Sequence, residues 1–199
     1  MKSTYAAVWP LPWTLLAIQI AWGAMFIYFA ASALLTNRIK RRDTWSGRIL
    51  DRVLLLGGYV LLFSGLPLPM IANQHFLQPR AWLQIAGAVM TYIGVPLTIW
   101  SRASLGKYWS AVVALKQDHK LIQSGPYRAI RHPLYSGLIL AAYGMAACVT
   151  TWSSLAGALA LLTCFERRAK KEDTLLAGEF GAEFEAYRQR TGRLIPRMG

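Results

Sequence analysis

The sequence predicts an all-α, polytopic integral membrane protein with about five transmembrane helices. Hydrophobic residues make up 55% of the 199 residues, and the 16% that are charged are bunched between long apolar runs. A soluble domain of this length has too little interior to bury so much apolar surface. The formal net charge is nevertheless +13. A nucleic-acid-binding protein would spread such a charge over polar faces, so we expect basic membrane loops and no nucleic-acid partner.

The first half of the chain contains three apolar stretches close to the roughly 20 residues that one membrane span needs. We expect spans over residues 13–35, 53–72 and 82–100. Pro67 and Pro69 predict a kinked or broken end for the second span. The third has a Trp at each end, as is typical of residues at the membrane interface. Residues 1–100 therefore form the first predicted region.

The second predicted region, residues 101–199, contains a polar loop and one longer apolar stretch. This stretch covers residues 133–165 and is too long for one comfortable crossing. Polar residues lie near its middle, at 150–151 and 153–154. We therefore expect two helices in a tight hairpin. The charged remainder, residues 166–199, is expected to open with a helix that continues out of the bilayer.

The distribution of basic residues predicts the orientation. Of the 22 Lys and Arg residues, 20 fall within residues 37–52, 101–132 and 166–199. Under the positive-inside rule, these three segments face the cytoplasm. We therefore expect a multi-pass protein of a prokaryotic inner membrane, in contact with lipids and with a cytoplasmic C-terminus.

The cysteine and histidine residues do not form a recognisable ligand set. Both Cys148 and Cys164 lie in apolar stretches, whereas His75, His119 and His132 are scattered. Neither pattern has the spacing of a metal site or a disulfide framework. We therefore expect buried cysteines and no metal.

A first informative stretch, residues 119–137, reads HKLIQSGPYRAIRHPLYSG. Its Gly125-Pro126 pair signals a turn, and Pro133 suits the first turn of a helix, where its missing N–H costs nothing. His132 is therefore placed at the entrance to the fourth span, with Tyr135 on its first turn. Taken alone, this stretch is typical of a membrane-surface loop with snorkelling Arg and interfacial Tyr side chains.

A second informative stretch covers residues 168–196. Arg168 and Glu172 are four residues apart and share a helix face. Phe184 and Tyr187 place aromatic side chains on one side of a second, short helix. Taken alone, the stretch is typical of an amphipathic tail that rests on anionic lipid headgroups.

Together, the two stretches resemble the isoprenylcysteine carboxyl methyltransferase family and its wider prokaryotic relatives, which shade into phospholipid methyltransferases. Motifs kept in order and spacing carry the resemblance, which covers roughly residues 101–197. They are H-x-L-[IV]-x-S-G-x-Y at 119–127, R-H-P-x-Y-x-G at 131–137, R-x-x-x-E-[ED] at 168–173, F-G-x-x-[FY]-x-x-Y at 180–187, and the closing Ile195-Pro196. The earlier spans match only as hydrophobic segments.

The resemblance implies a methyltransferase that uses S-adenosylmethionine and releases S-adenosylhomocysteine. Its acceptor is expected to be a lipophilic small molecule or lipidated substrate that enters from the bilayer. The catalytic residues implied are Arg168, which would orient an acceptor carboxylate, and Glu172, which would also bind the ribose or amino group of the cofactor. The implied cofactor-binding residues are His119, Leu121, Gly125, Tyr127, His132, Pro133, Tyr135, Gly137 and Glu172.

The sequence departs from the family pattern at two places. Asp173 stands where the family has the second Glu of a Glu-Glu pair. Ser110-Ala111 stands where the eukaryotic enzymes have an Asn-His pair. The second departure bears on whether the acceptor is a prenylcysteine more than on whether methyl transfer occurs.

Several functions remain open at this stage. Displacement of a methyl group from a sulfonium by an ionised carboxylate or thiolate needs no strong base, so the lack of a catalytic dyad is compatible with methyl transfer. Phospholipid N-methylation and thiol S-methylation are alternatives to carboxyl methylation. An NADPH-dependent sterol-type reductase and a non-catalytic protein with the same fold are alternatives from other classes. The S-G-P-Y and R-H-P-L-Y-S-G spacings favour the methyltransferase.

Overall fold

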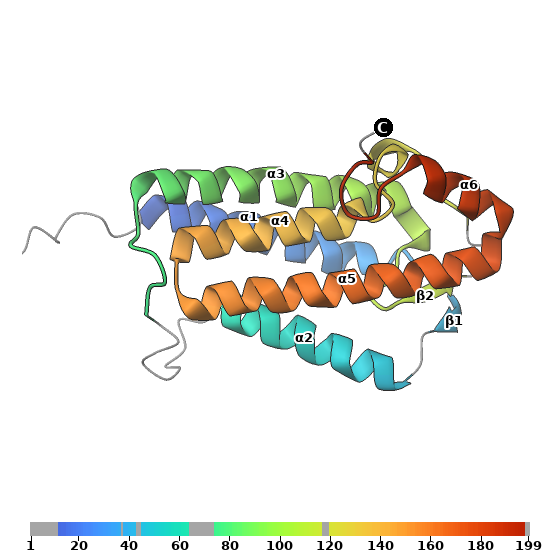
Figure 1. The fold of residues 1–199 in the computed structure, drawn as a ribbon, viewed down its shortest axis with the longest axis horizontal. Coiled ribbons are helices and arrows are strands. Elements are labelled where there is room, and N and C mark those ends of the chain that lie inside the picture. The colour runs from blue at the N-terminus through green and yellow to red at the C-terminus, as the bar shows by residue number, and fades with distance from the viewer. Residues whose placement is uncertain (1–11, 37, 43–44, 64–73, 117–119, 198–199) are drawn as a thin grey trace, which may run out of the picture.

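The computed structural model describes residues 12–36, 38–42, 45–63, 74–116 and 120–197, and these residues are mainly helical. Five helices run side by side along the long axis, and a sixth, short helix lies at one end (Figure 1). The helices are α1 (Pro12–Ala33), α2 (Trp45–Phe63), α3 (Ala81–Leu105), α4 (Pro133–Val149), α5 (Trp152–Phe180) and α6 (Ala182–Arg190). Two short 3-10 helices lie between α3 and α4. The first, η1 (Gly106–Tyr108), follows α3, and the second, η2 (Gly125–Arg128), precedes α4.

The prediction of an all-α fold class is confirmed, and the described residues form two short strands besides the helices. The strands β1 (Ile39–Arg42) and β2 (Ala114–Lys116) pair antiparallel, with an irregularity in register between Ile39 and Arg41. They join the loop after α1 to the loop after α3 at the same end of the bundle as α6 (Figure 1).

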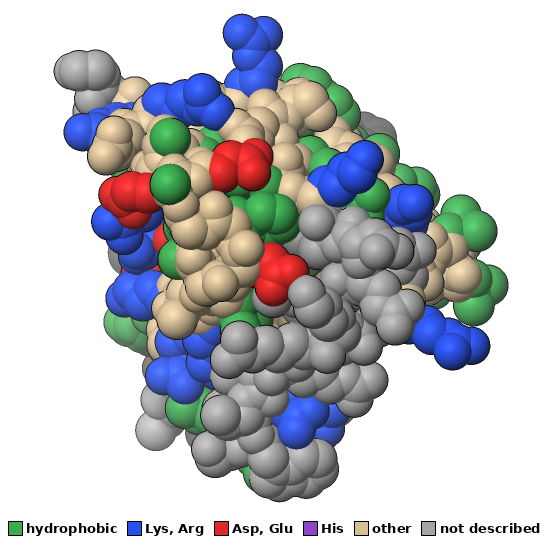
Figure 2. Space-filling model, turned by 90° about the vertical axis from the view of Figure 1, so that its right-hand side faces the viewer, with side chains coloured by type: hydrophobic (Ala, Val, Ile, Leu, Met, Phe, Trp, Pro, Cys, Tyr) green, Lys and Arg blue, Asp and Glu red, His purple; other side chains and the backbone are tan. Residues whose placement is uncertain are grey.

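This end of the bundle, which we call the basic end, gathers the three segments rich in Lys and Arg. The helices alternate in direction, so the loops after α1 and α3 and the C-terminal half of α5 all meet there (Figure 1). Lys and Arg side chains are spread over the face seen at this end (Figure 2). The one-sided charge pattern of the sequence therefore corresponds to one end of the folded bundle.

Among the described residues, two helical segments are long and apolar enough to cross a membrane, Thr14–Ala33 and Ala81–Tyr108, and the apolar α4 is shorter. Large apolar side chains are exposed on the outside of the bundle, such as Ile27 at 72% and Leu56 at 64%. Soluble proteins rarely expose contiguous apolar surface of this kind. Membrane crossing by all five helices stays a prediction, and Pro67 and Pro69 lie outside the described residues.

The expected hairpin is confirmed, and its polar residues form the turn. Helix α4 ends where Thr150 adopts a left-handed conformation (φ 56°). Thr151 then caps α5, because its side chain accepts a hydrogen bond from the backbone N–H of Ser154 while Ser154 reaches back to Thr151. Helix α5 has 29 residues, about 44 Å at 1.5 Å per residue, so it extends beyond a hydrocarbon core of about 30 Å.

Helix α4 is the centre of the bundle, with eleven of its 17 residues buried. It meets α3 through glycines spaced seven residues apart on each helix. A Cβ added at Gly137 would lie 2.3 Å from Thr98 Oγ1 and 2.6 Å from the Gly94 carbonyl oxygen, and one at Gly144 would lie 2.5 Å from the Gly87 carbonyl oxygen. Only glycine permits the two backbones to come this close. The contact fixes the position of α4 against α3, and so the position of the start of α4 at the basic end.

Candidate functional site

A cavity opens at the basic end between the loop after α3, the start of α4 and the second half of α5. Its walls come from residues 105–114, 120–135 and 172–176, together with Tyr187 of α6. Its volume is about 100 Å³, several times the ~10–15 Å³ that a single water requires. The wall is mixed, with Leu, Ile and Val side chains as well as Tyr, His, Arg and Glu side chains.

The structure brings five of the predicted cofactor-binding residues to this cavity: Leu121, Tyr127, His132, Tyr135 and Glu172. Three others lie behind its wall. Gly125 opens η2 with φ 59°, where an added Cβ would lie 3.0 Å from Ser104 Oγ, and Pro133 is the buried first residue of α4. Gly137 packs against α3. The ninth residue, His119, lies outside the described residues.

His132 lies between two carboxylates. Its Nε2 is 2.7 Å from Asp173 Oδ1, and its Nδ1 is 3.3 Å from Glu172 Oε2. Tyr135 donates its hydroxyl to Glu172 Oε1 at 2.5 Å. Burial disfavours the charged imidazole, but the hydrogen bonds to Asp173 and Glu172 outweigh it and raise the pKa of His132. Glu172 is therefore held toward the cavity by two side chains of the first turn of α4.

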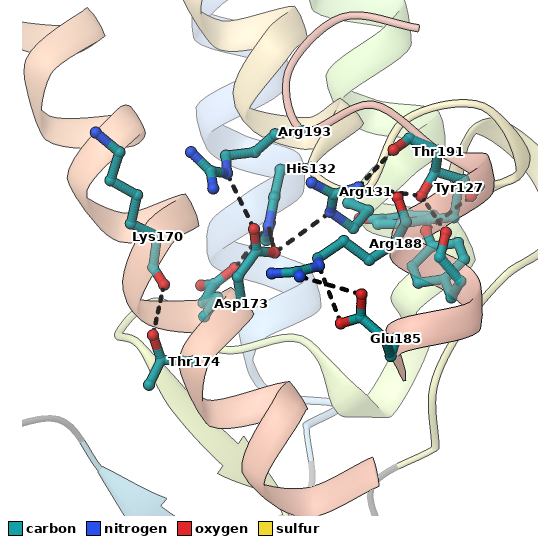
Figure 3. Close-up of polar contacts among 12 residues, drawn as sticks. Tyr127, Arg131, His132, Lys170, Asp173, Thr174, Glu185, Arg188, Thr191 and Arg193 are labelled. Carbon is teal, nitrogen blue, oxygen red and sulfur yellow. Dashed lines mark hydrogen bonds and ion pairs between the residues drawn. The ribbon is translucent and has the colours of Figure 1, made fainter. Parts of the chain in front are cut away.

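Asp173 is the centre of the polar network, although it is not among the site residues predicted from the sequence. Arg193 Nε donates to Asp173 Oδ2 at 2.9 Å, and Arg131 Nε lies 3.6 Å from Asp173 Oδ1 (Figure 3). Burial raises the pKa of this carboxyl, but its hydrogen bonds and nearby cations lower it further, so the net pKa lies below the ordinary value. The sequence feature that could have identified Asp173 is its position as the second acidic residue of the R-x-x-x-E-[ED] motif.

The segment that follows α6 is paired with the segment that precedes α4. The backbone N–H groups of Arg131 and His132 donate to the carbonyls of Gly192 and Arg193, at 2.8 and 3.0 Å. The guanidinium of Arg131 donates to the carbonyl of Thr191 at 2.5 Å. These bonds connect the C-terminal part of the chain to the wall of the cavity.

A second link joins two of the aromatic wall residues, Tyr127 and Tyr187. The Tyr187 hydroxyl donates to the Tyr127 carbonyl at 2.7 Å, and both side chains are buried. The position of α6 is therefore coupled to that of η2 (Figure 3).

Arg168, predicted as an acceptor-binding residue, does not line this cavity. It is buried, and its Nη1 donates to the Ala111 carbonyl at 3.2 Å. No ion pair between Arg168 and Glu172 is present in the part of the chain that the structure describes, because Glu172 turns toward His132 and Tyr135. Arg168 instead lines a smaller pocket on the other side of Val112, a residue that both spaces share.

Comparison with known proteins identifies relatives of this region. The model of the isoprenylcysteine carboxyl methyltransferase (ICMT) family matches residues 87–178. The chain is 31% identical over 118 residues to a probable protein-S-isoprenylcysteine O-methyltransferase of Oryza sativa subsp. indica, covering 58% of this chain and 62% of the relative. It is 34% identical over 126 residues to the cobalt-zinc-cadmium resistance protein CzcN of Cupriavidus metallidurans, covering 62% of this chain and 56% of the relative.

A protein-S-isoprenylcysteine O-methyltransferase of Schizosaccharomyces pombe is 34% identical over 94 residues, covering 46% of this chain and 40% of the relative. The chain thus spans less than two thirds of the length of each of these three relatives. The family match begins in α3 and ends in α5, so it contains all of the cavity wall except Tyr187. This match confirms the resemblance seen in the motifs: residues 87–178 are similar to the isoprenylcysteine carboxyl methyltransferase family.

Proposed function

We propose that this protein is a membrane-embedded, S-adenosylmethionine-dependent methyltransferase that acts on a lipophilic acceptor. The observation that carries the proposal is the cavity at the basic end, where five motif residues from two distant stretches of sequence converge. Its place at the end of an apolar bundle gives a cytosolic cofactor and a membrane-borne acceptor access to one site.

The cavity wall has the groups that this cofactor requires. Glu172 presents a carboxylate that suits a ribose hydroxyl or an amino group. Arg131 also lines the cavity, and its positive charge suits a ligand carboxylate. The aromatic side chains of Tyr127, Tyr135 and Trp109 suit a sulfonium cation.

When bound, the cofactor would supply a methyl group on a positively charged sulfur and would leave as a neutral thioether. The protein's part is to align the acceptor and to exclude water. His132 and Tyr135 hold Glu172 in place, and apolar residues such as Leu121 and Leu176 also line the cavity. Arg168 orients the acceptor from the far side of Val112. A carboxylate acceptor is already ionised, so no general base is needed.

Calorimetry on the protein purified in detergent tests the cofactor. We expect S-adenosylmethionine to bind and NADPH not to bind. Binding of NADPH alone would indicate a reductase, and binding of neither would favour a non-catalytic protein.

We further propose that all five long helices cross the membrane, with the basic end in the cytoplasm of a prokaryotic cell. A reporter fused after Gly199 is expected to be cytoplasmic, and one inserted within residues 74–80 is expected to be external. Finding both reporters on the same side would contradict the five-span arrangement.

A further inference from the structure

Arg102, in the last turn of α3, is a buried cation that does not line the cavity. Only 2% of the residue is exposed, and it forms no ion pair with any residue that the structure describes. A buried guanidinium is costly unless other groups replace its lost hydration. The groups that surround Arg102 therefore have to supply this replacement.

Backbone carbonyls at two helix ends supply part of it. Arg102 Nη2 donates to the carbonyl of Ser32, in the last turn of α1, at 2.6 Å, and Nη1 donates to the carbonyl of Gly106, which caps α3, at 2.8 Å. The last carbonyls of a helix lack partners within the helix and carry the negative end of its dipole. Arg102 is therefore stabilised at the point where α1 and α3 both end, beside the basic end (Figure 1).

An aromatic ring supplies the rest. The guanidinium carbon of Arg102 lies 4.4 Å from the centroid of the Trp109 ring, and Trp is the aromatic side chain that attracts a cation most strongly. Phe29 of α1 packs edge-on against the same ring, with a centroid distance of 5.4 Å and an interplanar angle of 87°. The indole ring of Trp109 is thus held by one residue of α3 and one of α1.

Trp109 connects this buried cation to the cavity. It lies in the loop after α3 and is one of the residues that line the cavity, and its side chain is only half-buried. A ligand in the cavity can therefore meet the Trp109 ring, whereas it meets Arg102 only through that ring.

We infer that Arg102 is a positioning residue, which fixes the Trp109 ring for contact with the cofactor. The inference rests on the proposed function and adds two residues to its site, Trp109 at the cofactor and Arg102 behind it. A ring that is already held in one orientation loses less side-chain freedom when a ligand binds. Lysine cannot replace Arg102, because an ammonium group has no planar fork that donates to two carbonyls while lying over a ring.

A double-mutant cycle tests the inference, with S-adenosylmethionine affinity measured by calorimetry on the protein in detergent. We expect Arg102→Lys and Trp109→Leu each to weaken binding on the order of tenfold. The double variant is expected to bind no more weakly than Trp109→Leu alone, because Arg102 acts through the ring. An arginine that served only the stability of the helix ends would give losses that add.

A second variant reaches the same ring without changing a buried charge. Phe29→Leu is expected to weaken binding about threefold, the scale of one aromatic pair, and to have no further effect when Trp109 is already replaced by Leu. This variant keeps the inference testable if Arg102→Lys does not fold. Lys107→Gln is the matched control, because Lys107 is an exposed cation 5.5 Å from the Tyr108 ring centroid and is not itself among the lining residues. We expect its affinity to equal that of the unmodified protein.

Two results would overturn the inference. One is a double variant whose loss equals the product of the two single losses. The other is unchanged affinity of both Arg102→Lys and Phe29→Leu at preserved unfolding temperatures. In either case binding of S-adenosylmethionine by the unmodified protein would leave the proposed function intact, whereas its absence would refute the proposed function by itself.

Discussion

Two groups of buried charges lie at the basic end, and they differ in how completely they are paired. Around Asp173, one carboxylate is shared by His132, Arg193 and Arg131. Around Arg168, the carboxylate of Asp51, which lines the same small pocket, pairs with Arg167 and Lys171, and Arg168 itself forms no ion pair with a described residue. A carboxylate shared by several cations holds a wall in position, whereas a buried cation without an ion pair is suited to an anionic ligand. The first group therefore organises the site, and the second is placed to receive a substrate.

The most disruptive test of this contrast is removal of the shared carboxylate. Asp173→Asn keeps the size of the side chain but removes the carboxylate that pairs with Arg131, and it leaves His132 with Glu172 and Arg193 with Glu166 as their remaining acidic partners. Removing one partner of a buried ion pair lowers the free energy of unfolding by about 3–5 kcal/mol, and we expect most of this loss here. We also expect the variant to lose cofactor binding. Thermal unfolding in detergent measures it. Glu166→Gln removes an acid from half-exposed ion pairs and is expected to cost well under about 1 kcal/mol.

A second test concerns the group around Arg168, with a substitution that keeps its positive charge. Arg168→Lys retains the cation but loses the planar fork. We expect S-adenosylmethionine affinity to stay nearly unchanged while methyl transfer to a lipophilic carboxylate, such as a prenylated thio-acid, falls on the order of a hundredfold. Arg167→Lys is the control, because a lysine can still pair with Asp51 from this half-exposed position. Turnover of Arg168→Lys near that of the unmodified protein would show that Arg168 does not orient the acceptor.

Residues that join the network to the cavity should affect the cofactor. Glu172→Ala and His132→Ala are each expected to weaken S-adenosylmethionine binding by about 1–3 kcal/mol, the scale of a lost charged or buried hydrogen bond. Calorimetry measures this change, and Glu185→Ala is the control because its pair with Arg188 is exposed. Unchanged affinity in both variants, with unfolding temperatures preserved, would remove these residues from the cofactor site.

The pairing around Asp173 also predicts a pH dependence. The pKa of His132 is raised above 6.5, so its contribution to stability is complete below pH 6.5 and is lost as the pH rises through the raised value. The pKa of Asp173 is lowered below 3.8, so its contribution is present above pH 3.8 and is lost as the pH falls through the lowered value. We expect stability to decline above pH 6.5 by at most about 1.4 kcal/mol per pH unit. His132→Asn should remove this decline, and a decline of equal size in that variant would assign it to another group.

Local patterns predicted the elements that local chemistry determines. Pro133 marked the start of α4, and the polar residues at 150–154 marked the hairpin, because capping and turn preferences act over a few residues. The convergence of five motif residues on one cavity followed from the resemblance. Spacing alone did not predict it, since each stretch by itself is typical of a membrane-surface segment.

The sequence did not predict the contacts between segments that lie far apart along the chain. The bonds between residues 131–132 and 192–193 join segments about 60 positions apart and leave no periodic signal. The strand pair β1–β2 is too short to show an alternating pattern. Arg168 and Glu172 share a helix face, but they are separated by a full turn of α5, and that turn is enough to place them at different pockets.

The close contact between α3 and α4 limits how the site can open. Because the glycines at 87, 94, 137 and 144 leave no slack between the two backbones, α3 and α4 move as a single rigid body. Leu105 at the end of α3 and His132 at the start of α4 therefore keep a constant separation. Any hinge that admits an acceptor must lie in the other walls, in the loop at 106–114 or in α6 with its attached segment. Substrate entry is thereby assigned to the parts of the site that are held by hydrogen bonds and not by interlocked helices.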